Sequence, residues 1–174
     1  SYSPNANSWY RSKQDGVTVE LVTPNAYVKN SVTQKDEHIS INGISYYYEP
    51  TGKLAQNKWI YSNGMSAWFQ ANNKGVLVTE ITPWGYFQNG NQHFDTVATA
   101  NNNKRYYFVS LALGGTMSMD TWSQSSSTNL WYQSNVKGEI IYQDKVGPIL
   151  PSYVSLDKGQ WKMYQQWQDG WPTG

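Results

Sequence analysis

The chain repeats itself along its length, and this repetition limits the folds that it can adopt. Three segments begin with tryptophan and a second aromatic residue and reach a glycine after five more residues; they are residues 9–16, 68–75 and 131–138. Beyond the glycine, residues 16–27 (GVTVELVTPNAY) match residues 75–86 (GVLVTEITPWGY) without a gap, 59 positions later. Self-similarity at a fixed period is the signature of a repeat architecture, in which each unit packs on its neighbours.

A shorter period lies within the long one. Single or paired aromatic residues recur every 18 to 24 positions, at Trp9, Tyr27, Tyr47, Trp68, Tyr86, Tyr107 and Trp131. Asn-Gly dipeptides, which tolerate the positive φ angles of a tight type I′ turn, stand at positions 42–43, 63–64 and 89–90. The sequence has no long apolar stripe of helical spacing. The pattern therefore predicts β-hairpins of about 20 residues each and very little helix.

The expected fold is all-β, built from tandem β-hairpin repeats within a single domain over residues 1–174. One hairpin of this size is not stable alone in water, whereas stacked hairpins bury one another's aromatic faces. Two architectures satisfy this requirement: a β-solenoid, or a closed body with pseudo-three-fold symmetry, such as a β-trefoil or a small propeller. The approximate repeat blocks are residues 9–67, 68–130, and 131–174 together with 1–8.

Charge and cysteine content exclude several classes of partner. The chain has 13 basic and 12 acidic residues, a net charge of +1, so we expect neither a nucleic acid nor an anionic membrane surface as partner. No apolar stretch is long enough for membrane insertion, and the absence of cysteine excludes disulfides and thiolate metal sites. The polar start over residues 1–8 is expected of a mature or excised segment of a secreted protein.

The aromatic content points to carbohydrate. Nine tryptophans and fourteen tyrosines stand against only four phenylalanines. A tryptophan or tyrosine ring combines a flat apolar face with a polar group, so it can pack on the C–H face of a sugar while neutral amides and hydroxyls bind the rim. The same rings can surround a quaternary ammonium group, at about 0.5–2 kcal/mol per contact. Repeated weak sites gain avidity on a polymer, which favours a polysaccharide or cell-wall glycan as partner.

The tryptophans divide by their position in the repeat. Those of the set Trp9, Trp68 and Trp131 share one repeat position, so we expect them to form an internal layer. Others follow polar segments and precede turns, which favours exposure. The predicted ligand-binding residues are Trp59, Trp84, Trp122, Tyr47, Tyr107 and Trp167.

No constellation of catalytic residues is evident. The only histidines are His38 and His93, and neither belongs to a metal-ligating motif. The sequence also has no nucleophile elbow of the Gly-x-Ser-x-Gly type. We therefore expect no catalytic residue, no metal and no cofactor. One alternative is a β-rich glycan-active enzyme with a carboxylate pair, for which Glu80 and Glu139 are candidates. A second is an adhesive surface module that binds a protein partner through its aromatic residues.

Residues 42–68 (NGISYYYEPTGKLAQNKWIYSNGMSAW) resemble the cell-wall-binding or glucan-binding repeats of Gram-positive surface proteins. Choline-binding modules and the glucan-binding domains of glucansucrases belong to that family. Trp59 is similar to the leading tryptophan of such a repeat, and residues 68–69 to its aromatic strand; the resemblance extends to about residue 138. It implies a non-catalytic hairpin module, secreted or on the cell surface, that attaches to cell-wall polymer or glucan. The oligomeric state stays open.

Overall fold

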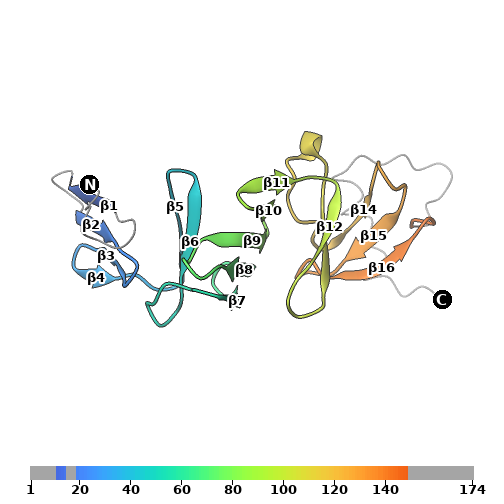
Figure 1. Ribbon diagram of the computed structural model, residues 1–174. Helices are drawn as coiled ribbons and strands as arrows, with labels where there is room; N and C mark the ends of the chain where they lie inside the picture. The colour runs from blue at the N-terminus through green and yellow to red at the C-terminus, as the bar shows by residue number, and fades with distance from the viewer. Residues whose placement is uncertain (1–10, 15–18, 149–174) are drawn as a thin grey trace. The chain divides into compact units, whose positions relative to one another are not determined.

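The computed structural model describes residues 11–14 and 19–148, and its regular structure is almost entirely β-strand (Figure 1). The described strands form five sheets, and neighbours within each sheet are also consecutive in the chain. The all-β fold of tandem antiparallel hairpins is thereby confirmed, and no sheet among the described residues closes into a barrel. The choice between a solenoid and a closed body stays a prediction, as does the division into the three repeat blocks.

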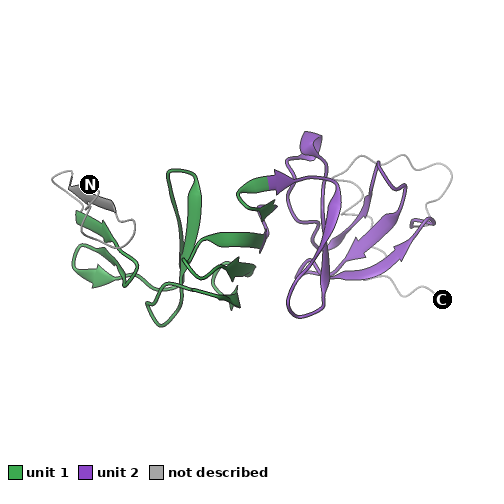
Figure 2. Cartoon of the chain, in the orientation of Figure 1, with its two compact units in different colours: residues 1–80, 87–91 green, residues 81–86, 92–174 purple. Residues whose placement is uncertain are grey.

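The described residues belong to two compact units (Figure 2). Unit 1 contains the described residues up to 80 together with 87–91, and unit 2 contains residues 81–86 and those from 92 onward. The strands of unit 1 are β1 (Arg11–Gln14), β2 (Val19–Val22), β3 (Tyr27–Lys29), β4 (Val32–Thr33), β5 (Glu37–Ile41), β6 (Ile44–Tyr48), β7 (Lys58–Ser62) and β8 (Ala67–Ala71). Strands with residues in both units are β9 (Leu77–Thr82), β10 (Gly85–Gln88) and β11 (Asn91–His93). Those of unit 2 are β12 (Thr96–Thr99), β13 (Arg105–Phe108), β14 (Thr121–Gln124), β15 (Trp131–Ser134) and β16 (Ile140–Asp144), with a short 3-10 helix, η1 (Leu111–Leu113).

Four hairpins are each closed by the same type of backbone hydrogen bond. They are β5–β6, β7–β8, β12–β13 and β14–β15, and each follows an Asp or Asn with φ between 49° and 55°. These two residue types tolerate the left-handed region better than most. The backbone N–H of each donates to the carbonyl of the residue just after the second strand, at 2.8–3.2 Å. The four donor and acceptor pairs are Asp36 and Glu49, Asn57 and Asn72, Asp95 and Val109, and Asp120 and Asn135.

The 59-residue repeat extends to individual hydrogen bonds. The hydroxyl of Thr23 donates to the carbonyl of Ala26 and accepts from its N–H, both at 3.1 Å. Thr82, 59 positions later, makes the same two bonds with Gly85, at 2.7 and 3.0 Å. The repeated Thr-Pro segment is therefore one conserved turn geometry, formed once in each unit.

Two of the three predicted type I′ turns are confirmed. Both residues have positive φ at 42–43 and at 89–90, as that turn requires. The prediction for 63–64 is wrong, because β7 and β8 are joined by four residues and the left-handed residue is Ser66. Glycine is needed at position 64 for another reason: a Cβ there would collide with the carboxylate of Asp36.

One connection is longer in unit 2 than in unit 1. In unit 1, the N–H of Gly52 donates to the carbonyl of Glu49, and the N–H of Glu49 donates to the carbonyl of Lys53. In unit 2, the corresponding loop from Val109 to Thr116 holds three additional residues and includes η1. The antiparallel bridge across the loop is kept in both units, between Tyr48 and Leu54 in unit 1 and between Phe108 and Met117 in unit 2. The extra length is thus confined to the turn.

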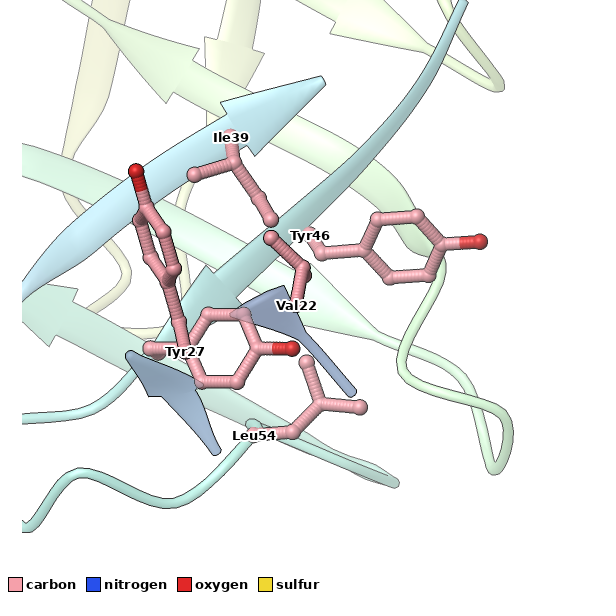
Figure 3. Packing of buried hydrophobic residues seen from close by; sticks show 6 residues of the cluster. Val22, Tyr27, Ile39, Tyr46 and Leu54 are labelled. Carbon is pink, nitrogen blue, oxygen red and sulfur yellow. The ribbon is translucent and has the colours of Figure 1, made fainter. Parts of the chain in front are cut away.

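The core of unit 1 consists of two aromatic clusters. In the first, β2, β3, β5 and β6 contribute side chains that surround Val22 (Figure 3). Its buried members are Val22, Tyr27, Ile39, Tyr46, Tyr48 and Leu54. The second consists of Tyr47, Ala55, Ala67, Phe69, Ala71 and Leu77. Unit 2 has a related cluster of Tyr107, Val109 and Tyr132, in which the tyrosine rings stack with centroids 4.7 Å apart.

The predicted internal tryptophan layer is wrong for the two members that the structure describes. Trp68 and Trp131 are only half-buried, whereas the next residues, Phe69 and Tyr132, point into the core. Successive side chains of a strand face opposite sides, so Trp68 and Trp131 lie on the side of their strands opposite to the core rings Phe69 and Tyr132. Trp9 lies outside the described residues.

An aspartate carboxylate joins consecutive hairpins within each unit. Asp36 accepts hydrogen bonds at 2.5 Å from the hydroxyl of Tyr47 in its own hairpin and from that of Ser62 in the next. Asp95 accepts from Tyr107 at 2.6 Å, and from the hydroxyl of Ser126 and the N–H of Ser127 at 3.1 and 3.0 Å. We call these two arrangements the aspartate clamps.

The clamp in unit 2 stabilises the charged carboxylate. Burial alone would raise the pKa of Asp95, but hydrogen bonds from Tyr107, Ser125 and Ser127 outweigh it and hold that pKa well below its usual value. Burial and the hydrogen bond to the carboxylate together raise the pKa of the Tyr107 hydroxyl. The clamp therefore holds a charged acceptor and a neutral donor across the whole physiological pH range.

The first prediction concerns the glycine after the β7–β8 hairpin. Gly75 has a φ of 84°, and a Cβ on it would lie 2.5 Å from Leu54 Cδ2, whereas Gly43 has a φ of 80° with open space around it. Both alanine substitutions carry a left-handed penalty of about 1–2 kcal/mol, and Gly75→Ala also overpacks the core by about 1–3 kcal/mol. Urea unfolding should show the larger loss of stability for Gly75→Ala; equal losses would contradict this packing.

The second prediction concerns acid stability. Because the pKa of Asp95 is lower in the folded protein than in the unfolded chain, the clamp stabilises the fold above about pH 4. That contribution is lost as the pH falls through the folded-state pKa. Asp95→Asn should cost about 1.5–3 kcal/mol near neutral pH and progressively less below pH ~4. The exposed Asp144→Asn serves as the control. A stability difference for Asp95→Asn that does not change between neutral and acid pH would refute the clamp's charged state.

Candidate ligand-binding faces

The outward side of the β7–β8 hairpin carries three aromatic rings. Register pairs Tyr61 with Trp68 and Trp59 with Gln70, so these four side chains share one face. The ring centroids of Trp59 and Trp68 are 6.3 Å apart at an interplanar angle of 70°, and those of Tyr61 and Trp68 are 5.2 Å apart at 55°. Trp68 is thus the central ring of the three, with Tyr61 the most exposed at 38%.

A row of polar side chains continues this face across the next strands. The hydroxyl of Thr79 on β9 donates to Gln70 Oε1 at 2.8 Å and accepts from Gln88 Nε2 on β10 at 3.0 Å. None of these groups is charged. Aromatic rings are therefore followed directly by amides and a hydroxyl. We define face 1 as Trp59, Tyr61, Trp68, Gln70, Thr79 and Gln88.

A second face lies on β14, β15 and β16 of unit 2. Register places Gln133 between Trp122 on one side and Tyr142 on the other, and pairs Trp131 with Gln124 and Asp144. The rings of Trp122 and Tyr142 meet edge to face, with centroids 5.0 Å apart at 63°. Face 2 is defined as Trp122, Gln124, Trp131, Gln133, Tyr142 and Asp144.

The two faces occupy the same place in the repeat. Three positions hold the same residue type 63 positions apart: Trp59 and Trp122, Trp68 and Trp131, and Gln70 and Gln133. The third aromatic ring differs, since face 1 has Tyr61 beside Trp68 and face 2 has Tyr142 beside Trp122.

Each face also holds a buried indole N–H without an acceptor. Among the described residues, neither Trp68 Nε1 nor Trp122 Nε1 has a hydrogen-bond partner. An unsatisfied buried donor costs about 1–3 kcal/mol, and most such groups in folded proteins are paired. In both faces the unsatisfied indole belongs to the tryptophan that contacts the tyrosine. An acceptor oxygen at either position would remove this penalty.

The structure separates the residues that the sequence grouped as ligand-binding. Trp59 and Trp122 lie on faces 1 and 2, and Trp84 is 42% exposed within the turn between β9 and β10. Tyr47 and Tyr107 are buried, and their hydroxyls belong to the aspartate clamps. The structure therefore places these two tyrosines where they support the hairpins, away from solvent. Trp167 lies outside the described residues.

Several face residues were missed by sequence reasoning. Gln70 and Gln133 sit in the matched segments 68–75 and 131–138, and Tyr61 lies two positions after Trp59. The two-residue period of a strand places i and i+2 on one side, so this spacing could have identified Tyr61. Thr79 and Tyr142 carry no local signal, because their place depends on strand pairing.

The two acidic residues considered for catalysis have other partners. His38 Nε2 lies 2.6 Å from Glu80 Oε1, and the imidazole stacks on Phe69 at 5.4 Å. The carboxylate of Glu139 in unit 2 accepts from Asn135 Nδ2 at 2.9 Å. No group of three or more metal-ligating side chains occurs in the described part of the chain. Nor does any helix in that part have the length and apolarity to cross a membrane.

No protein-family model matches the chain, and no curated protein matches it. Among solved structures, it is similar to the modular autolysin LytC from Streptococcus pneumoniae, with 17% identity, a TM-score of 0.27, and coverage of 74% of this chain and 37% of that one. For truncated alternansucrase from Leuconostoc mesenteroides the identity is 19% and the TM-score is 0.29, with coverage of 66% of this chain and 10% of that one. For the choline-binding domain of CbpL from Streptococcus pneumoniae the identity is 20% and the TM-score is 0.26, with coverage of 76% of each chain.

The chain thus spans about a third of the autolysin and a tenth of the alternansucrase that it matches. The matched structures include the choline-binding domains of CbpL and Spr1274 from Streptococcus pneumoniae.

The third prediction concerns the buried pair of His38 and Glu80, whose side chains are 20% and 4% exposed. Removal of the imidazole by His38→Ala leaves the carboxyl group without this hydrogen-bond partner, which should lower the free energy of unfolding by about 1–3 kcal/mol. The double variant His38→Ala/Glu80→Gln should recover part of that loss, because a neutral amide is less costly to bury. Chemical denaturation of the four proteins in this cycle measures the coupling; strictly additive losses would refute it.

Proposed function

We propose that the protein is a non-catalytic carbohydrate-binding module that attaches to a bacterial cell-wall polymer or glucan through faces 1 and 2. The observation that carries this proposal is the composition of face 1, where three aromatic rings continue into an uncharged row of amides and a hydroxyl. A secreted or cell-surface location follows from such a ligand. The sequence resemblance to cell-wall-binding and glucan-binding repeats supports the same class of partner.

The chemistry of face 1 matches that of a neutral sugar. A pyranose ring offers an apolar C–H face, which an aromatic ring can cover, and a rim of hydroxyls, which amides can bind in both donor and acceptor roles. The absence of charged side chains among the six residues of face 1 removes the desolvation penalty that an unpaired charge would carry.

Two faces in one chain suit a polymeric ligand. A single aromatic platform binds a sugar weakly, but a polymer that occupies both faces gains from the high effective concentration of the second contact. That gain depends on the two faces being engaged by the same polymer chain. Short oligosaccharides should therefore bind much more weakly than the polymer.

The fourth prediction tests this function. Trp59→Ala and Trp122→Ala should each weaken binding to soluble glucan or purified cell-wall polymer about tenfold, and the double variant should abolish avidity. Binding is measured by isothermal titration and by tryptophan fluorescence. Leu111→Ala, at a residue that is 70% exposed and outside both faces, is the control.

Trp84→Ala tests the separate role that the sequence predicts for this exposed residue. Failure of the unaltered protein to bind any neutral glycan or wall polymer would reject the proposed function. Unchanged binding by the double variant would reject the two faces as the binding surface.

A further inference from the structure

The two faces differ at a structurally equivalent position on the third strand. Thr79 lies beside Gln70 in face 1, and Tyr142 lies beside Gln133 in face 2. These two residues are 63 positions apart, as are the two glutamines. The same amide therefore has a hydroxyl neighbour in one unit and an aromatic neighbour in the other.

Thr79 determines how the amides of face 1 are oriented. Thr79 is 6% exposed. Its hydroxyl forms hydrogen bonds with the amides on both sides, donating to Gln70 Oε1 and accepting from Gln88 Nε2. With Oε1 engaged, the NH₂ group of Gln70 is directed away from Thr79. A fixed donor needs no reordering when it meets a ligand oxygen, which reduces the entropic cost of binding.

Tyr142 does not perform this task in face 2. Its hydroxyl donates to the carbonyl of Val146 at 2.8 Å, and its ring packs on Trp122. Among the described contacts, Gln133 receives no hydrogen bond from it. Face 2 therefore offers aromatic surface where face 1 offers an oriented polar row.

We infer that Thr79 is a positioning residue that makes face 1 selective for the hydroxyl pattern of neutral sugars, whereas face 2 contacts its ligand mainly through aromatic rings. This inference rests on the proposed function and assigns different roles to the two faces. The module then distinguishes sugars by their hydroxyl groups through face 1, and face 2 adds binding that is less selective.

The test isolates face 1 in the full chain by means of Trp122→Ala. Two probes are titrated: a neutral isomalto-oligosaccharide, which needs both rings and amides, and tetramethylammonium, which needs only rings. Addition of Thr79→Val should lower affinity for the oligosaccharide about tenfold and change that for tetramethylammonium by less than about twofold. Thr79→Ser should restore oligosaccharide binding, because it returns the hydroxyl. Thr99→Val, at an exposed threonine of β12, is the matched control.

Thermal unfolding of each variant establishes that it is folded. Undiminished oligosaccharide binding by Thr79→Val would overturn the inference, and so would an equal loss for both probes or a failure of Thr79→Ser to restore affinity. If the Trp122→Ala protein binds neither probe before Thr79 is changed, the proposed role of face 1 fails instead. The two failures are therefore distinguishable.

Discussion

The aspartate clamps are the interaction on which the rest of the structure depends. A hairpin of this length has too little buried surface to be stable by itself, so each must be held against the next. The carboxylates of Asp36 and Asp95 do this by accepting hydrogen bonds from a tyrosine in one hairpin and from serine groups in the following one. Charge-assisted bonds of this kind are stronger than neutral ones, and they fix the position of the aromatic cores that lie beside them.

Faces 1 and 2 follow from that arrangement through the alternation of strand side chains. Once Phe69 and Tyr132 are directed into the cores, the preceding Trp68 and Trp131 must face outward. The same tryptophan-aromatic pair thus supplies a core ring and a surface ring. In these two pairs the second ring packs in the core and the tryptophan lies on the outer side, where Gln70 and Gln133, two positions after each tryptophan, share the same face.

Much of the fold could be predicted from the sequence because its determinants are local. The Asn-Gly turns at 42–43 and 89–90, the hairpins and the 59-residue repeat all arise from short-range patterns. The site was predicted less completely. Trp59 and Trp122 lie on faces 1 and 2, whereas Tyr47 and Tyr107 are buried on the clamps, since a Tyr-rich strand gives no local indication of which ring meets a distant aspartate. Thr79 and Tyr142 reach their faces only through pairing between strands.

The longer connection that contains η1 shows how such a chain can tolerate changes in length. The three additional residues between Val109 and Thr116 lie in a turn, so β14 and β15 after it keep their inward and outward sides. Because three is an odd number, the same insertion inside a strand would exchange those sides and turn every core ring toward solvent. Turns can therefore accept insertions with an odd or an even number of residues, whereas an insertion within a strand keeps the core side chains inside only if its number of residues is even. In this fold, the turns can change in length while the composition of faces 1 and 2 stays the same.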